Sequence, residues 1–169
     1  MAKKIFSTLK DILQILITSL LIVFICFKFI FISAEVVGTS MYPTLQDGDR
    51  GFSFIISRNI EIKRFDICVI DSNKASELLV KRVIGLPNEK IEYKDNKLYI
   101  NGEYIKEDFL SEDVYTNDFS YVLGEDEYFC LGDNREVSRD SRSYGSFIKE
   151  EIKSTGFFAY YPFDRFGLK

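Results

Sequence analysis

The chain has 169 residues, a length that suits one domain with residues left over for an anchor or a tail. Hydrophobic residues make up 46% and aromatic residues 15%, so the chain can build a core and is not expected to be disordered. The net charge of −4 gives no basic excess for nucleic-acid binding, and the absence of histidine excludes Ser-His-Asp and Cys-His catalytic sites and zinc sites with a histidine ligand. Acid–base chemistry near neutral pH must therefore come from a Lys, Asp, Glu, Tyr or Cys with a shifted pKa.

The N-terminal region is typical of a membrane span. From Ile12 to Ile32 the residues are almost all apolar, and a helix over these 21 residues would measure about 32 Å, enough to cross the bilayer core. Lys28 lies close to the outer end, where a long side chain can reach the headgroups. A cleavable secretory leader and a buried core helix are the alternatives. The length of the segment, apolar on all faces, favours an uncleaved anchor.

The charges around the span predict its orientation. Three lysines precede it with no acidic residue before Asp11, a bias that places the N-terminus in the cytoplasm: Lys3, Lys4 and Lys10. Residues 1–33 carry a net charge of +3, which leaves −7 on the remainder. We therefore predict a single-pass protein of the cell membrane with a cytoplasmic N-terminus over 1–10, a transmembrane anchor over 11–33 and an extracytoplasmic β catalytic domain over 34–169.

The outer domain is predicted to be mainly β. Short apolar runs alternate with turns and give strands at 50–56, 65–70, 78–84, 91–105 (three strands), 128–131 and 156–161. Asn101-Gly102 between alternating apolar residues is typical of a type I′ hairpin, and Lys94-Asp95-Asn96 marks the preceding turn. Many short strands with tight turns indicate an antiparallel sheet that closes into a sandwich or small barrel. Residues 149–154 are predicted to form a short helical turn.

The domain also contains an acidic segment and two cysteines. Residues 106–127 hold eight carboxylates and one lysine, and we expect a solvated acidic excursion rather than a calcium loop, because the ordered Asp/Asn spacing with glycine is missing. Of the three cysteines, Cys26 lies in the span. Cys68 and Cys130 either form a bridge, which an oxidising exterior permits, or remain buried free thiols.

A candidate nucleophile follows the span. The segment from Gly38 to Leu45 reads GTSMYPTL, and Ser40 lies in a bend bounded by glycine and proline. Such a bend can present a hydroxyl and a backbone N–H to a substrate, and Gly38 allows the close approach of another backbone. Taken alone, the segment also fits an ordinary turn.

A candidate base lies in the run LLVKRVI. Strand alternation places Lys81 on the same face as Leu79 and Val83 and places Arg82 on the opposite face. Loss of hydration on an apolar face lowers the pKa of a lysine and makes it usable as a base. The alternative is that Lys81 faces solvent and Arg82 is the buried, paired residue.

The loop from Gly132 to Gly145 is dense in charges and hydroxyls. We expect four of its residues to form a self-contained network of ion pairs and hydrogen bonds: Asp133, Arg135, Asp140 and Arg142. Such a network can hold a hydroxyl rigidly beside a neutral lysine. The alternative is a well-capped surface loop.

Together these segments resemble the type I signal peptidases (leader peptidases), bacterial membrane-anchored serine peptidases with a Ser-Lys dyad. The resemblance covers nearly the whole chain, and the small size with one anchor is similar to the Gram-positive form. Each motif is weak alone, but their combination in the family's order is specific: the anchor, Ser40–Leu45, Gly48-Asp49, Lys81–Pro87 and Gly132–Arg142.

The resemblance implies a role for each matching residue. Ser40 is the nucleophile, Lys81 is the general base, Ser138 hydrogen-bonds the lysine amine, and Asp140 with Arg142 forms a supporting salt bridge. Two positions depart from the family: Asn88-Glu89 stands where Gly-Asp is usual, and Gly38 stands where some members carry a serine that contributes to the oxyanion hole. We expect no metal or cofactor.

The predicted substrate is the signal peptide of a secretory preprotein that already lies in the lipid bilayer. An extended substrate is expected to pair with the edge that carries Ala34, Val36 and Gly38, which share a strand face. Small apolar pockets, lined in part by Ala34, Val36 and Leu79, suit the family's preference for small residues at −1 and −3. The oxyanion and substrate-binding positions are predicted to be Gly38, Ser40, Met41, Ala34, Val36 and Leu79.

Three alternative functions remain at this point. A non-enzymatic relative that assembles surface structures would keep the fold without the dyad, and the presence of Ser40 and Lys81 argues against it. A self-cleaving Ser-Lys repressor would need a cytosolic DNA-binding domain in place of the span. A dedicated member that processes or assembles a few surface proteins, such as pilins, shares all the motifs with the general enzyme.

Overall fold

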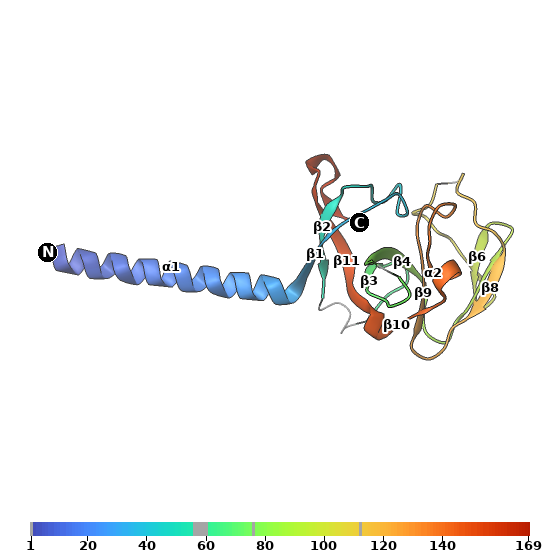
Figure 1. The fold of residues 1–169 in the computed structure, drawn as a ribbon, viewed down its shortest axis with the longest axis horizontal. Helices are drawn as coiled ribbons and strands as arrows, with labels where there is room; N and C mark the ends of the chain where they lie inside the picture. The colour runs from blue at the N-terminus through green and yellow to red at the C-terminus, as the bar shows by residue number, and fades with distance from the viewer. Residues whose placement is uncertain (1, 56–60, 76, 112) are drawn as a thin grey trace. The chain divides into compact units, whose positions relative to one another are not determined.

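The computed structural model describes residues 2–55, 61–75, 77–111 and 113–169, without the side chains of 2–5 and 26. The chain divides into two units, Met1–Phe31 and Ile32–Lys169. The first unit is the helix α1, Ala2–Ile30 (Figure 1). Its Phe6–Ile30 portion has 25 residues with a mean hydropathy of 2.4, long and apolar enough to cross a membrane. The hydroxyls of Thr18 and Ser19 are satisfied within the helix, since Thr18 donates to the carbonyl of Gln14 and Ser19 to that of Leu16.

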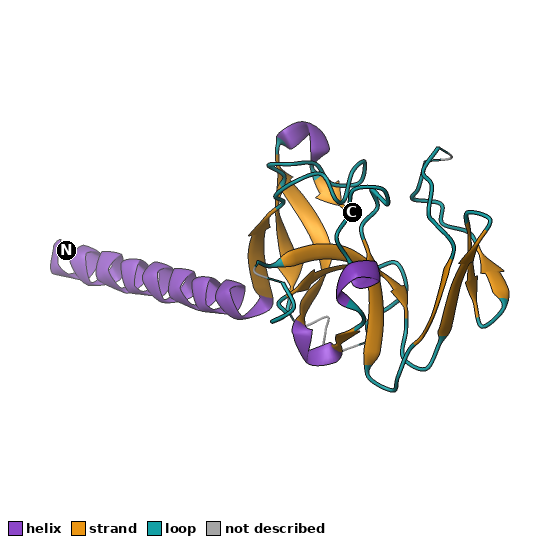
Figure 2. Cartoon of the chain, turned by 45° about the vertical axis from the view of Figure 1, so that its right-hand side comes forward, coloured by secondary structure: helices purple, strands orange, loops and turns teal. Residues whose placement is uncertain are grey.

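The second unit is built on an eight-stranded antiparallel sheet that curls on itself (Figure 2). Along the sheet the strands follow in the order β1 (Phe31–Glu35), β2 (Arg50–Phe54), β11 (Ile152–Tyr161), β3 (Ile67–Ile70), β4 (Leu79–Gly85), β9 (Glu127–Leu131) and β10 (Phe147–Ile148), and β12 (Gly167–Leu168) pairs with β11. The ten-residue β11 pairs with β3 through its first half and with β2 through its second half, and bulges or irregularities interrupt both pairings. Bulges bend a strand, so β11 turns the sheet. The predicted mainly β, barrel-like class is confirmed.

A second, four-stranded sheet carries the order β7 (Glu103–Ile105), β6 (Lys97–Ile100), β5 (Lys90–Lys94) and β8 (Phe119–Val122). Both predicted turns are confirmed, since Asp95 and Asn96 join β5 to β6 with positive φ angles and Asn101-Gly102 joins β6 to β7 in the same way. In Figure 1 this sheet lies on the far side of β3, β4 and β9 from β2.

The acidic segment 106–127 is more than a solvated excursion. It contains β8, which pairs along β5 and places Phe119 opposite Tyr93. Phe119 also stacks on Tyr93 and Phe129, so the segment covers part of a core. The strand is short, and the carboxylates on both sides of it hide its alternation in the sequence.

Other element boundaries moved by a few residues. The strand expected at 156–161 begins at Ile152, which leaves only Lys149–Glu151 for the expected helical turn. The expected strand at 50–56 ends at Phe54, and its last residue lies outside the described residues. β1 ends at Glu35, so Val36 and Gly38 lie beyond the strand that was expected to hold them. The helix α2 (Ser141–Tyr144) and β10 were not predicted.

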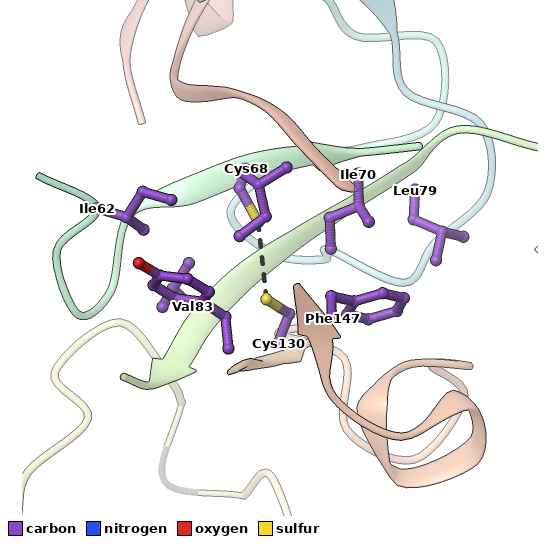
Figure 3. Close-up of a cluster of buried hydrophobic side chains, with 9 residues drawn as sticks. Ile62, Cys68, Ile70, Leu79, Val83, Cys130 and Phe147 are labelled. Atoms are coloured by element: carbon purple, nitrogen blue, oxygen red, sulfur yellow. Dashed lines mark hydrogen bonds between the residues drawn. The ribbon is translucent and has the colours of Figure 1, made fainter. Parts of the chain in front are cut away.

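Three apolar clusters support these sheets. One lies beneath the segment that follows β1 and contains Val36, Met41, Leu45, Ile67, Phe157 and Ala159. A second fills the small sheet and its contact with β9. The third lies between β3, β4, β9 and β10 and includes Cys68 and Cys130, whose sulfurs are 3.9 Å apart and which are free thiols (Figure 3). The structure therefore places the two cysteines side by side without a bridge.

Candidate active site

Ser40 is held by the loop that follows β9. Asn134 donates its backbone N–H to the carbonyl of Ser40 at 3.0 Å and its side-chain Nδ2 to the carbonyl of Thr39 at 3.1 Å. Met41, the next residue, is fully buried in the cluster beneath. The bend is thus fixed from both sides, which leaves the hydroxyl of Ser40 facing β4. Sequence reasoning did not single out Asn134, although it lies in the Gly-Asp-Asn-Arg motif that gave the resemblance.

Lys81 lies in the middle of β4 and is 3% exposed. Its Nζ donates to Ser40 Oγ at 2.8 Å and to the carbonyl of Val80 at 2.9 Å. Leu79 and Val83, on the same face of the strand, are buried as the alternation predicted. The structure thus brings the two proposed reacting groups, 41 residues apart in the chain, within hydrogen-bond distance.

Arg82, on the opposite face of β4, is buried as well. It forms a two-pronged ion pair with Asp133, with Nε 2.9 Å and Nη2 2.7 Å from the two carboxylate oxygens. The sequence presented burial of Lys81 and burial of Arg82 as alternatives, and the structure contains both. Because Asp133 precedes Asn134, this ion pair fixes the loop that holds Ser40 against the strand that carries Lys81.

The surroundings of Lys81 favour its neutral form. Burial lowers the pKa of the Lys81 ammonium below its ordinary value, and the carboxylate of Asp140 is the strongest influence in the opposite direction. The balance lies on the side of burial. A lysine with a lowered pKa and a hydroxyl at 2.8 Å is able to act as a base toward that hydroxyl.

Asp140 and Arg142 form the ion pair that the resemblance implied. Nε and Nη2 of Arg142 lie 2.8 Å from the two oxygens of Asp140. Asp140 is fully buried, caps α2 by accepting the N–H of Arg142, and accepts the N–H of Gly132. It therefore organises both ends of the loop at once.

The expectation that this loop forms a self-contained network was wrong. Asp133 pairs with Arg82 on β4, and the guanidinium of Arg135 pairs with Glu107 at 2.6 Å and also contacts Tyr93. Within the loop, Asp140 and Arg142 form an ion pair, and Nη2 of Arg142 also donates to the carbonyl of Arg135 at 2.7 Å. The partners lie far away in the sequence, so local charge spacing gave no sign of them.

Ser138 lies at the site but does not bond to the lysine in this structure. Its Oγ is buried and has no hydrogen-bond partner among the described residues. A side chain at Gly132 would collide with this Oγ and with the carbonyl of Ser40, so Ser138 borders the backbone of the nucleophile. The hydrogen bond to Lys81 implied by the resemblance is absent here, and the two hydrogen bonds of Nζ go to Ser40 and Val80.

A groove of about 520 Å³ leads to the dyad. Residues 35–40 form one wall and residues 77–81 the other, with Val137, Arg139 and Tyr144 at the third side. Of the predicted substrate-binding residues, Val36, Gly38, Ser40 and Leu79 line it. Ala34 and Met41 do not, because both pack into the cluster beneath.

The backbone N–H groups near Ser40 differ in availability. Within the described ranges, no acceptor receives the N–H of Ser40, which leaves it free for a substrate oxygen. The N–H of Gly38 donates to Asp47 at 2.7 Å, so Gly38 lines the groove but is not a free oxyanion donor. In the part of the chain that the structure describes, no three His, Cys, Asp or Glu side chains converge in a way that could hold a metal.

Comparisons with known proteins relate the chain to a family. The model of the family described as signal peptidase, peptidase S26, matches residues 9–161. The chain is 41% identical over 148 residues to a signal peptidase I of Bacillus licheniformis, covering 80% of each, and 34% identical over 179 residues to a signal peptidase IB of Staphylococcus aureus (strain COL), covering 93% of each. A crystal structure of a signal peptidase I from Enterococcus faecalis V583 superposes with a TM-score of 0.51 at 35% identity, covering 56% of this chain and 96% of that one.

Proposed function

The chain belongs to the signal peptidase family, peptidase S26, and on that premise we propose that it removes N-terminal signal peptides from exported preproteins, with Ser40 as nucleophile and Lys81 as general base. The observation that carries this proposal is the 2.8 Å hydrogen bond between Lys81 Nζ and Ser40 Oγ in a buried setting that favours the neutral amine. With no histidine in the chain, no conventional base competes for this role.

The proposed reaction has two halves. Lys81 takes the Oγ proton as Ser40 attacks the scissile carbonyl, and the resulting ammonium gives that proton to the leaving amine as the C–N bond breaks. In the second half Lys81 takes a proton from water, the hydroxyl adds to the acyl carbonyl, and the proton returns to Ser40 Oγ as the acid product leaves. The free N–H of Ser40 supports a role as one oxyanion donor.

The groove suits an extended peptide that enters along the 35–40 wall. Val36 and Leu79 contribute apolar surface to its lining, beside Ser40 and Lys81. Such walls favour small side chains, which supports cleavage after small residues at −1 and −3. No metal or cofactor enters the proposed reaction.

The proposed setting is the cell membrane. The 25-residue apolar portion of α1 supports a single-pass anchor, and the lysines at positions 3, 4 and 10 support a cytoplasmic N-terminus with the catalytic domain outside. The partners in this setting are the lipid bilayer and secretory preproteins whose signal helices lie in it, and not nucleic acid.

The direct test is cleavage of a preprotein by the purified full chain in liposomes. We expect a single cut after a small residue, identified by sequencing the new N-terminus. Two controls accompany it: a preprotein with Phe at −1 and the Ser40→Ala variant, neither of which is expected to yield product. Intact preprotein, or equal cleavage by Ser40→Ala, would contradict the proposal. Sequencing secreted proteins after depletion of this chain separates a general enzyme from a dedicated one.

A further inference from the structure

We propose that Arg165, in the turn that precedes the C-terminal strand, is a positioning residue for substrate binding. Through the buried carboxylate of Asp49 it fixes residues 36–38, the wall along which the substrate lies. This inference rests on the proposed peptidase function and adds to it a residue from a part of the chain that none of the sequence motifs includes.

The contact between Arg165 and Asp49 joins two distant segments. Nε and Nη2 of Arg165 lie 2.8 and 2.6 Å from the same oxygen of Asp49, and the side chain of Asp49 is fully buried. The other oxygen of Asp49 accepts the N–H of Gln46 at 2.8 Å. A buried carboxylate needs such partners. If the Arg165 guanidinium is lost, the carboxylate of Asp49 is buried without a charged partner, and the turn at 46–49 must rearrange to expose it to water.

Arg165 itself is held firmly at the end of the chain. It lies in the short helical turn η3 (Phe163–Arg165), and β12 after it pairs with β11 through Phe158↔Leu168 and Ala159↔Gly167. Phe166 packs edge-on against Phe158, with ring centroids 4.9 Å apart. The C-terminal segment is therefore a fixed support for the guanidinium.

The turn at residues 46–49 holds the groove wall, residues 36–38, in place. The N–H of Val36 donates to the carbonyl of Asp49 at 2.8 Å, and the carbonyl of Val36 accepts the N–H of Gly48 at 2.9 Å. Asp47, the residue before Gly48 in this turn, accepts the N–H of Gly38 through its side chain. Both ends of the 36–38 segment are thus bonded to the turn that Arg165 anchors.

This arrangement turns Val37 toward the substrate. Successive residues of an extended segment direct their backbone groups to opposite sides, and Val36 and Gly38 use the inner side. Among the described residues no partner takes up the N–H or carbonyl of Val37, whose side chain is 79% exposed and lines the groove. A substrate strand is expected to pair with these free groups.

The nucleophile has a separate support. Thr39 and Ser40 are held by Asn134, which is tied through Asp133 to β4. Disturbing Arg165 is therefore expected to weaken substrate binding while the Ser40–Lys81 pair stays in place. A loss of this kind raises KM and leaves kcat nearly unchanged.

The test is the substrate dependence of cleavage by the full chain, with thermal unfolding recorded for each variant. For Arg165→Gln we expect KM to rise about tenfold with kcat within about twofold of wild type. Arg165→Lys keeps a cation at the site and is expected to recover part of the binding. Asp164→Asn is the control for the surface contact of Arg165: the exposed Asp164 lies 3.9 Å from Nη1 of Arg165, and loss of so exposed a pair is expected to leave wild-type behaviour.

A second variant covers the case in which Arg165→Gln does not fold. Asp49→Asn with Arg165→Gln removes the buried charge together with its partner, and we expect it to fold and to keep the raised KM. An unchanged KM, or a fall in kcat at constant KM in a folded variant, would overturn the positioning role. If instead wild type cleaves nothing, the proposed function itself fails, which the wild-type reaction in the same experiment shows directly.

Discussion

At the scale of single residues, the unusual feature is a lysine that is buried without a carboxylate partner of its own. Lys81 is 3% exposed, and its two hydrogen bonds go to a hydroxyl and a backbone carbonyl. Asp140, whose carboxylate has the largest raising effect on the pKa of Lys81, is already paired with Arg142. An ammonium in such a place costs stability, and that cost is what makes the neutral amine available to Ser40.

This cost predicts the behaviour of Lys81→Met. Because the folded-state pKa of Lys81 is lowered, the unfolded chain binds the extra proton below about pH 10.4, and wild-type stability rises as pH increases toward that value. A methionine side chain carries no proton that must be lost or buried on folding. We therefore expect Lys81→Met to be inactive but more stable than wild type by about 1 kcal/mol at pH 7, with the difference shrinking as pH rises. Denaturant unfolding at several pH values measures it. A less stable variant at pH 7 would contradict the burial argument.

Ser138→Ala tests the hydroxyl that the structure leaves without a partner. Since no hydrogen bond is lost and a buried polar group is removed, we expect unchanged or slightly higher stability. We also expect a substantially lower cleavage rate, on the view that Ser138 bonds to the lysine during the reaction. Unfolding curves and single-turnover rates measured on one preparation separate the two effects. A wild-type rate would make Ser138 a structural residue only.

The sequence was informative about residues whose role follows from local chemistry. The absence of histidine and an apolar strand face made Lys81 a candidate base, and the resemblance to the type I signal peptidases implied that role. It was silent on partners fixed by the tertiary structure, such as Asp133 for Arg82, Glu107 for Arg135 and Asp49 for Arg165. Charge pairs between distant segments leave no pattern in the sequence, which is why the loop network was assigned wrongly.

At the scale of elements, β4 is the strand on which the site depends. It pairs with β3 on one side and β9 on the other, with Cys68 opposite Lys81 and Cys130 opposite Val83. The curl of the sheet brings the two sulfurs to 3.9 Å on the buried face (Figure 3). The Cys68 thiol donates to the carbonyl of Lys81 and thus packs directly beside the backbone of this lysine.

These thiols are expected to be chemically unreactive and, since neither lies in a dyad motif, dispensable for activity. Burial raises the pKa of the Cys130 thiol, so little thiolate forms even in mildly alkaline solution. In the native protein without reductant we expect Cys68 and Cys130 to resist alkylation at pH 7 and pH 9, and both to react after denaturation. Peptide mapping by mass spectrometry identifies the labelled sites. Cysteines that stay unlabelled after denaturation until reductant is added would show a bridge instead.

Elements were predictable where turns and alternation were regular. The β5–β7 hairpins follow from Asp95-Asn96 and Asn101-Gly102, whose positive φ angles only a few residue types accept. β8, β10 and β12 were missed because each has only two to four residues and is defined by its partner strand rather than by its own pattern. The long β11 was cut short because its bulges interrupt the alternation.

At the scale of the whole molecule, the sequence predicted a mainly β fold after an apolar N-terminal helix but not how the sheet is ordered. An apolar helix followed by a β domain could be inferred from composition and turn spacing. The path β1-β2-β11-β3-β4-β9-β10, which places the late strand β11 between two early ones, could not, because strand pairing depends on contacts far apart in the chain. That order is also what allows the C-terminal turn to reach Asp49.

The predicted topology is tested by protease added to intact protoplasts. From the lysines that precede the span, we expect residues 34–169 to be degraded while a cytoplasmic marker protein survives. A tag at the N-terminus is expected to stay protected until the cells are lysed. Full protection of the domain in intact protoplasts would reverse the orientation.

The central claim is that Ser40 and Lys81 act as one unit, and single-turnover cleavage of a preprotein tests it most directly. Four variants are compared with wild type: Ser40→Ala, Lys81→Ala, Lys81→Arg and the Ser40→Ala/Lys81→Ala double variant. We predict that each single change lowers the rate on the order of a thousandfold or more, that the double variant loses little beyond that, and that Lys81→Arg is as inactive as Lys81→Ala because a guanidinium stays protonated. Strictly additive losses, or an active Lys81→Arg, would contradict the dyad.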